Sequence, residues 1–202
     1  MTAARTVFTL GHSTHAIDRF IELLRLHGVS AVADVRSSPY SRMNPQFNRE
    51  IVKNALKQRG VAYSFLGREL GARPEDPACY VDGRARYDLI ARTPLFGSGL
   101  ERVADGSRRY RIALVCAEKD PTTCHRALLV CRHLIEQGFS IKHILADGKI
   151  EDHEASLRRL AVQVGASLDD LFRSYDEVVE DIYTRRARDI EYVQTKPAEE
   201  SP

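Results

Sequence analysis

The sequence predicts an α/β fold with a mainly parallel sheet that is covered by helices on both faces. Strand-like and helix-like segments alternate from the N-terminus onward, which is the pattern of parallel strands joined by crossover helices. The segment VSAVADVR, residues 29–36, is almost continuously apolar, as expected of a central strand. At 202 residues with 43% hydrophobic residues, the chain is long enough for one well-buried domain.

The first third of the chain has the clearest periodicity. In order, the expected elements are a strand at 6–10, a turn at 11–14, a helix at 16–28, a strand at 29–36, a loop at 37–47, a helix at 48–60 and a strand at 61–67. Gly28 is expected to end the first helix. In the second helix, Ile51, Ala55 and Leu56 are expected to point inward.

Patterns are weak over residues 67–111, a turn-rich region that is only loosely helical between 84 and 105. The expected elements after it are a buried strand at 110–118, a helix at 124–138, a last strand at 139–148 and helices at 151–165 and 167–193. Asp120 or a threonine is expected to cap the helix at 124–138, with Pro121 in its first turn. Its buried face should comprise Leu128, Cys131, Leu134 and Ile135.

The C-terminal part reads as a helical extension of the same domain. We expect an α/β core at residues 1–152, the extension at 153–194 and a disordered tail at 195–202. The last helix is expected to open with a capping box between Ser167 and Asp170. It carries a continuous apolar stripe: Leu168, Leu171, Phe172, Tyr175, Val178, Val179 and Ile182. This stripe can pack on the core or on a second copy, so a homodimer through the C-terminal helix is one expectation.

Composition excludes several classes of protein. The net charge of +2 gives no whole-surface argument for nucleic acid or membranes, and no apolar run is long enough to span a bilayer. We therefore expect a cytoplasmic protein without membrane contact, whose four cysteines are reduced thiols. No CxxC pair is present and Cys124 adjoins His125, so a metal site is not expected. The sequence identifies no cofactor.

Polar residues follow three of the expected strands at the point where each strand ends. Ligands of parallel sheets bind outside the carboxyl ends of the strands, so these residues are expected to form one anion-accepting site. The candidate anion-binding residues are Ser13, Thr14, Asp34, Arg36, Ser38, Ser41, Arg42, Cys116 and Arg126. The candidate catalytic residues are His12, Glu118, Cys124 and His125.

The residue types suggest the chemistry of this site. Arginines offer multi-donor forks that suit phosphate or carboxylate, and histidines or a glutamate can move protons near neutral pH. Cys124 lies beside His125 and Arg126 at a helix start, a setting that lowers a thiol pKa. Plainer interpretations remain open. Cys116 and Cys131 can be buried packing, and Asp34 can simply accept internal hydrogen bonds.

The strings TLGHST, VADVRSSPYSR and CAEKDPTTCHR, followed by KHILADG, resemble the domain-of-unknown-function family 488. The resemblance runs from about Thr6 to Gly148. One departure is Ala72, where that family often has a second glycine. The resemblance implies a Rossmann-like fold and a shared polar pocket, without naming a reaction. Its motif positions are here His12, Ser13, Asp34, Arg36, Pro39, Ser41, Arg42, Cys116, Glu118, Cys124, His125 and Arg126.

Three functions fit these observations. The first is an enzyme, a transferase or hydrolase, with an arginine-rich pocket for a phosphorylated or nucleotide-like substrate. The second is cysteine-dependent, rhodanese-like thiol chemistry at Cys124. The third is a non-catalytic nucleotide- or nucleic-acid-binding module, linked to DNA repair or to defence against foreign DNA. We favour the first, with a small anionic ligand or nucleotide as the partner.

Overall fold

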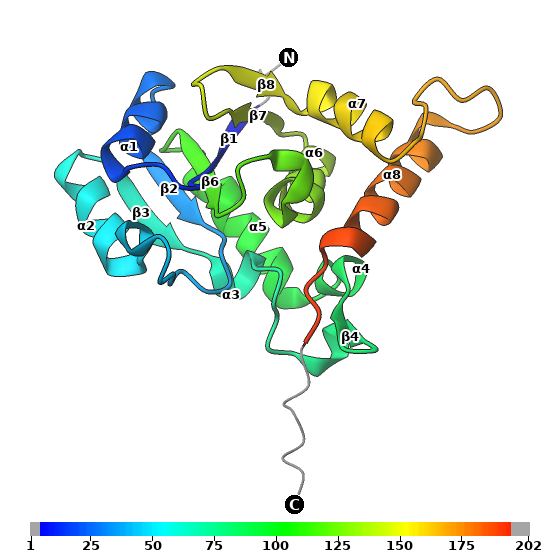
Figure 1. Cartoon of the computed structure of the whole chain (residues 1–202), viewed down its shortest axis with the longest axis horizontal. Helices are drawn as coiled ribbons and strands as arrows, with labels where there is room; N and C mark the ends of the chain where they lie inside the picture. Colours follow the sequence, from blue (N-terminus) through cyan, green and yellow to red (C-terminus); the bar gives the residue numbers. More distant parts are fainter. Residues whose placement is uncertain (1–4, 195–202) are drawn as a thin grey trace, which may run out of the picture.

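The computed structural model describes residues 5–194, in which a central sheet lies between two layers of helices (Figure 1). The strands of this sheet are β1 (Thr6–Gly11), β2 (Ala31–Asp34), β3 (Ala62–Phe65), β6 (Ile112–Cys116), β7 (Ser140–Ile144) and β8 (Ile150–Asp152). Their order is β3-β2-β6-β1-β7-β8. The tail predicted at 195–202 lies outside the described residues.

All strands of the sheet except β8 are parallel. The prediction that residues 139–148 hold the last strand is wrong, because β8 follows and pairs antiparallel with β7. Gly148 makes this reversal possible, since its φ of 92° lies in the left-handed region that favours glycine. The short β8 thus closes one edge of the parallel sheet.

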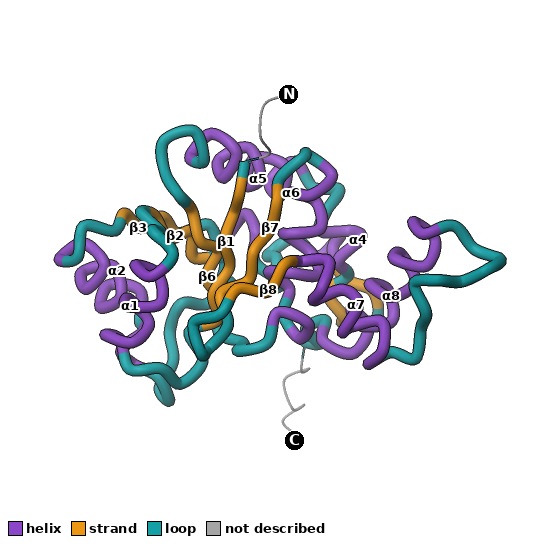
Figure 2. Tube along the Cα trace, turned by 90° about the horizontal axis from the view of Figure 1, so that it is seen from above, coloured by secondary structure: helices purple, strands orange, loops and turns teal. Residues whose placement is uncertain are grey.

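Alternate residues of the central strands face opposite layers, as the two-residue period of a strand requires. Val7 packs in one apolar cluster and Phe8 in the other, and both are buried. Helices α1 (Ile17–Leu26) and α2 (Arg49–Gln58) cover the face of Phe8. Helix α5 (Pro94–Gly106), a π-helical segment (Arg126–Cys131) and α6 (Arg132–Glu136) cover the other face (Figure 2). The predicted fold class is confirmed.

Two predicted helix faces are shifted. In α2, Val52 and Leu56 are buried while Ile51 is 50% exposed, so the inward stripe begins one residue later than predicted. In the helix after Cys124, Ile135 is 39% exposed instead of buried. The π-helical turn before it contains more residues per turn, so α-helical periodicity cannot be extended through it to Ile135.

The region 67–111 folds into short elements that border the sheet. They are α3 (Gly67–Leu70), a 3-10 turn (Pro77–Cys79), β4 (Tyr80–Val81), β5 (Arg84–Ala85), α4 (Tyr87–Ile90) and α5. Thr93 caps α5 by accepting a hydrogen bond from Phe96 N at 3.2 Å. Apart from α5, these elements have too few residues for periodicity to predict them.

The C-terminal extension contains α7 (His153–Gln163) and α8 (Tyr175–Ile190). The prediction of a helix from residue 167 is wrong. The capping box lies instead between Ser174 and Glu177, where each side chain bonds the other's backbone N–H. Leu171 and Phe172 are 91% and 96% exposed, and they precede α8 rather than continue its buried face.

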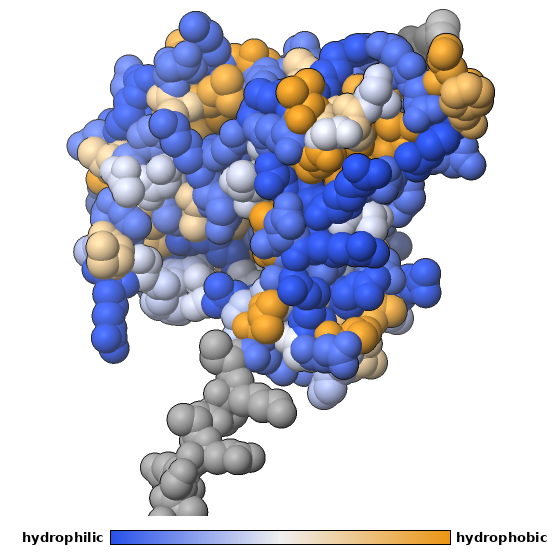
Figure 3. All heavy atoms as spheres, turned by 45° about the vertical axis from the view of Figure 1, so that its right-hand side comes forward, coloured by the Kyte–Doolittle hydropathy of each residue, from blue (hydrophilic) through white to orange (hydrophobic). Residues whose placement is uncertain are grey.

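The buried face of α8 packs on the protein's own core, through Val178 and Ile182. A dimer through this helix therefore has less apolar surface available than the sequence suggested, and it stays a prediction. The face of the molecule in Figure 3 is mostly hydrophilic, and its apolar atoms lie in separate groups. Within the described part of the chain, every helix is too short or too polar to cross a membrane.

Candidate functional site

The strands β2, β6 and β1 are neighbours, so their carboxyl ends meet at one edge of the sheet. A hollow of about 440 Å³ lies there, a size that suits a small ligand. The predicted site residues that line it are His12, Arg36, Ser38, Ser41, Cys116, Glu118 and His125. Three segments that are distant in sequence thus converge as the sheet-edge argument expected.

Other predicted site residues lie outside the lining of the hollow. Asp34, Cys124 and Arg126 are buried behind it, each no more than 1% exposed. Ser13 adopts a left-handed backbone conformation with φ 46°, and its carbonyl contacts the His12 ring. Thr14 and Arg42 are exposed on the loops that follow β1 and β2. The roles of these residues in binding or catalysis stay predictions.

His12 and Arg36 belong to one buried hydrogen-bonded chain. Asp34 accepts from Arg36 Nε at 2.8 Å and Nη2 at 2.6 Å, and from the Tyr63 hydroxyl at 2.8 Å. The third nitrogen, Arg36 Nη1, lies 3.2 Å from His12 Nε2. On the other side of the ring, His12 Nδ1 lies 2.9 Å from the carbonyl of Ser13. A donating Nδ1 and an accepting Nε2 satisfy both contacts, which is the neutral tautomer.

Burial and the charge of Arg36 lower the pKa of His12 to about 4, although the Ser13 carbonyl opposes this. His12 is therefore uncharged at neutral pH. Its ring also stacks on Phe47 at a centroid distance of 4.2 Å. The arrangement holds His12 firmly and engages two of the three guanidinium nitrogens of Arg36 with Asp34, which leaves Arg36 only partly free to bind an anion.

A second cluster joins two thiols, a carboxylate and an imidazole. Glu118 Oε2 accepts from Cys116 Sγ at 2.8 Å and from Cys124 Sγ at 3.0 Å. His125 Nδ1 lies 3.6 Å from Cys116 Sγ, while His125 Nε2 lies 3.0 Å from the carbonyl of Val35. The potential ligand atoms of the four side chains all lie within 4.8 Å of one another.

The members of this cluster differ in how easily they ionise. Burial raises the pKa of the Cys116 thiol and that of the Glu118 carboxyl. Burial also disfavours a Cys124 thiolate, but the hydrogen bond with Cys116 and the charges of Arg126 and His125 outweigh it and lower the pKa of Cys124. The more acidic thiol is thus the one that is shielded from the hollow, and Cys116 is the thiol that faces it.

Arg126 holds the loop that carries Glu118. Its guanidinium donates to the carbonyl of Glu118 at 2.7 Å, to the carbonyl of Lys119 at 3.3 Å and to Thr9 Oγ1 at 3.4 Å. Gly11 allows the close approach of this loop, because a Cβ there would lie 1.8 Å from the Glu118 carbonyl oxygen. Arg126 is therefore committed to backbone contacts behind the hollow rather than to a ligand in it.

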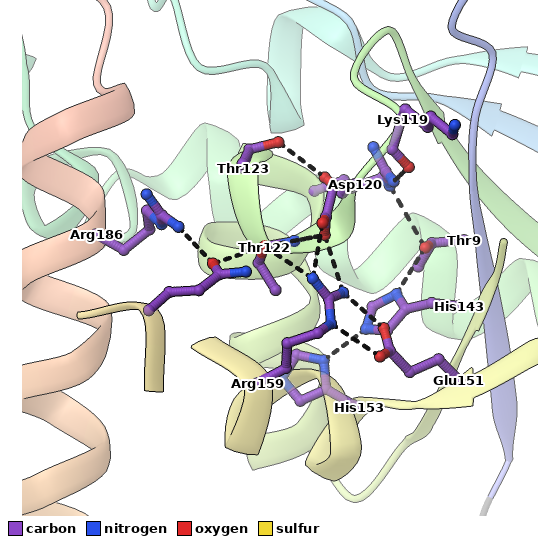
Figure 4. Close-up of polar contacts among 12 residues, drawn as sticks. Thr9, Lys119, Asp120, Thr122, Thr123, His143, Glu151, His153, Arg159 and Arg186 are labelled. Carbon is purple, nitrogen blue, oxygen red and sulfur yellow. Dashed lines mark hydrogen bonds and ion pairs between the residues drawn. The ribbon is translucent and has the colours of Figure 1, made fainter. Parts of the chain in front are cut away.

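The same loop is fixed from behind by Arg159 of α7 (Figure 4). Arg159 donates to both oxygens of Asp120, at 2.7 and 3.0 Å, and to both oxygens of Glu151, at 3.1 and 2.9 Å. Asp120 also accepts from Thr122 N at 2.9 Å, so it caps a separate 3-10 turn (Pro121–Thr123) rather than the helix at 124–138, for which the cap was predicted. These contacts, chiefly that with Arg159, offset burial and lower the pKa of Asp120 to about 2.

Next to this ion pair, a buried chain of polar groups ties the C-terminal extension to the sheet. Thr9 Oγ1 lies 2.8 Å from His143 Nδ1, and His143 Nε2 lies 3.0 Å from His153 Nδ1 (Figure 4). His153 Nε2 lies 2.6 Å from the hydroxyl of Tyr183 in α8. Burial lowers the pKa of both histidines, that of His153 to about 4.

Sequence reasoning missed several residues that line the hollow. They are Tyr40, Asn44, Ala72, Arg73, Tyr87, Ala117, Thr123, Ile190 and Tyr192. Arg73 is the important omission, because it adds an exposed cation whose guanidinium stacks on the Tyr192 ring at 4.4 Å. The segment Gly71-Ala72-Arg73 contained a signal for the position of Arg73. Gly71 packs so closely on Ser37 that a Cβ would lie 2.4 Å from its Oγ, which brings the following arginine to the hollow.

Comparison with known proteins identifies one family. A model of the family described as "Domain of unknown function DUF488" matches residues 16–132, more than half of the chain. No curated protein and no solved structure matches significantly.

Proposed function

We propose that this chain, which belongs to the DUF488 family of domains of unknown function, is an enzyme that binds a small anionic substrate, phosphorylated or nucleotide-like, in the sheet-edge hollow. One observation carries the proposal. Two arginines, Arg36 and Arg73, line the same hollow as the reactive side chains of Cys116, Glu118 and His125. Binding groups and chemically active groups that share one concave site are the usual composition of an active site.

The binding half of the hollow is built around Arg73. This guanidinium is exposed, whereas Arg36 is largely engaged by Asp34. Hydroxyls of Ser37 and Ser38 lie in the same lining and can donate to anionic oxygens. An exposed arginine held on an aromatic ring beside hydroxyl donors suits a phosphate group.

The reactive half lies at the end of β6. Cys116 and His125 form the floor of the hollow, and Glu118 lies at its rim. Carboxylate, thiol and imidazole are the side chains that most often transfer protons or attack an electrophilic centre. Because these groups and Arg73 line the same hollow, a substrate whose anionic part binds Arg73 would have its other atoms within the same enclosed space as the reactive side chains.

The proposal is tested by the thermal stability of the protein with adenosine monophosphate, adenosine triphosphate and inorganic phosphate. A ligand at about one hundred times its Kd stabilises the folded protein by about 2.7 kcal/mol, which shifts the melting temperature measurably. We expect at least one probe to do so with the wild type and the Arg68→Ala variant, but not with Arg73→Ala. Arg68 is a matched control, since it is exposed on α3 outside the hollow. Equal shifts in the two variants, or none in the wild type, would argue against the proposal.

Thiol chemistry is the second candidate, favoured by the position of Cys116 in the hollow. Alkylation by iodoacetamide, located by peptide mass spectrometry, distinguishes it from the first. Thiol chemistry requires that Cys116 reacts faster than Cys79, a buried cysteine remote from the cluster. Equal rates for the two cysteines would count against a nucleophilic thiol.

A further inference from the structure

We propose that Cys116, Cys124, His125 and Glu118 form a binding site for a zinc-type divalent cation at the floor of the hollow. This reverses the expectation from the sequence, where adjacent Cys124 and His125 argued against a metal. In the fold, β6 supplies Cys116, and the loop after it returns Cys124 and His125 to the same point. The site requires only these side chains, so it stands or falls separately from the proposed enzyme activity.

The donor set is that of a zinc site. Two sulfurs, one imidazole nitrogen and one carboxylate oxygen are four ligands of the kinds that zinc prefers, and their atoms lie within 4.8 Å of one another. Zinc–sulfur and zinc–nitrogen bonds of about 2.3 and 2.0 Å at a tetrahedral angle separate the two ligand atoms by about 3.5 Å. Cys116 Sγ and His125 Nδ1 are 3.6 Å apart, which matches this spacing.

Glu118 needs the largest adjustment to bind a cation. Its Oε2 lies 2.8 and 3.0 Å from the two sulfurs, closer than the edge of a tetrahedral site, so the carboxylate must move outward by roughly half an ångström. The side chain lies at the rim of the hollow, where such a movement is sterically open. Glu118 is thus the exchangeable ligand, and it faces the proposed substrate.

The orientation of His125 supports a ligand role independently. Its Nε2 lies 3.0 Å from the carbonyl of Val35, which requires a proton on Nε2, so the neutral form of the ring directs the lone pair of Nδ1 at Cys116. Metal-binding histidines typically donate their second N–H to a carbonyl or carboxylate in this way.

The charge around the cluster is compatible with a bound divalent cation. Arg126 is buried, and the three hydrogen bonds of its guanidinium end on neutral oxygens, namely two carbonyls and the Thr9 hydroxyl. A buried cation of this kind is costly unless negative charge lies nearby. Two thiolates and one carboxylate around a divalent cation leave one net negative charge, which would balance Arg126.

The experiment is a titration of the reduced, metal-free full chain with Co²⁺ and then with Zn²⁺. We expect one equivalent of Co²⁺ to produce thiolate-to-cobalt charge-transfer absorption, and one equivalent of Zn²⁺ to remove it. Cys116→Ala and Cys124→Ala should lose this absorption, while Cys131→Ala retains it, because Cys131 is a buried cysteine outside the cluster. Glu118→Gln should retain it with an affinity lower by about tenfold or more.

A measurement on the wild type guards against variants that fail to fold. With Zn²⁺ bound, Cys116 and Cys124 should be protected from alkylation in the folded chain relative to the metal-free protein, whereas Cys79 and Cys131 should be unaffected by the metal. The absence of a cobalt–thiolate band, or equal loss in Cys131→Ala and Cys124→Ala, would overturn the site. So would metal-independent protection through a disulfide between Cys116 and Cys124. None of these three results would bear on whether Arg73 binds an anion.

Discussion

Acidification should weaken the attachment of the C-terminal extension through His153. Its ring lies between His143 Nε2, at 3.0 Å, and the Tyr183 hydroxyl, at 2.6 Å. Burial lowers the pKa of His153 to about 4, below the value of 6.5 expected in the unfolded chain. As the pH falls, the unfolded chain therefore binds the proton first. The stability from the neutral ring is complete above about pH 6.5 and decreases as the pH falls toward 4.

The size of the effect follows from these two pKa values. At about pH 5, the unfolded chain binds a proton on His153 more readily than the folded chain does. This difference lowers the free energy of unfolding by about 2 kcal/mol for His153 alone. His143 has its pKa lowered in the same direction, so it adds to the loss. The hydrogen-bond pattern gives the structural reason. One N–H per ring satisfies the chain from Thr9 to Tyr183, whereas a charged His153 would direct a second N–H at His143.

Urea denaturation at about pH 7 and pH 5 measures this loss. The wild type should lose about 2 kcal/mol more between the two pH values than His153→Gln, which keeps a polar side chain but cannot titrate there. His133→Gln is the control, because His133 contacts the Leu129 carbonyl and lies outside the chain. An equal loss in the wild type and His153→Gln would show that the buried pair does not control stability.

Three further outcomes are expected. Gly11→Ala should lower the melting temperature and abolish ligand-induced stabilisation, because the alanine Cβ would lie 1.8 Å from the Glu118 carbonyl oxygen. A normal thermal shift of this variant with phosphate probes would refute the prediction. Ser174→Ala should lower the free energy of unfolding, measured by urea denaturation, by about 1 kcal/mol because the capping box is lost, and Ser167→Ala should lower it far less. The reverse ranking would support the helix start at residue 167 that the sequence predicted. Phe172→Ser should leave the free energy of unfolding almost unchanged, because the ring is 96% exposed, and a large loss would indicate a contact that the single chain does not contain.

The convergence of His12, Arg36 and Cys116 was predictable because strand ends are local features of the sequence. His12 and Arg36 follow strongly apolar strands and Cys116 ends one, and parallel strands place these ends at one edge. Arg73 and Tyr192 could not be placed in the same way. They reach the hollow through a turn-rich segment and the chain after α8, and periodicity describes only the element in which it occurs.

For the arginines, residue type alone did not predict which of them is available to bind a ligand. Arg36 and Arg126 were assigned to a ligand because a guanidinium suits an anion, but internal partners engage both. Asp34 binds two nitrogens of Arg36, and backbone carbonyls accept from Arg126. The sequence shows each donor but not which acceptor reaches it first, since that depends on tertiary packing. Nucleic-acid binding and a C-terminal dimer stay predictions, because they also depend on contacts that the sequence does not show.

The most direct measurement is a crystal of the full chain soaked with adenosine monophosphate and examined by difference electron density. Our account predicts a phosphate bound to the Arg73 guanidinium, with the rest of the molecule extending over Glu118. Phosphate density at another surface, with the space between Arg73 and Glu118 filled only by water, would contradict the assignment of this hollow as the substrate site.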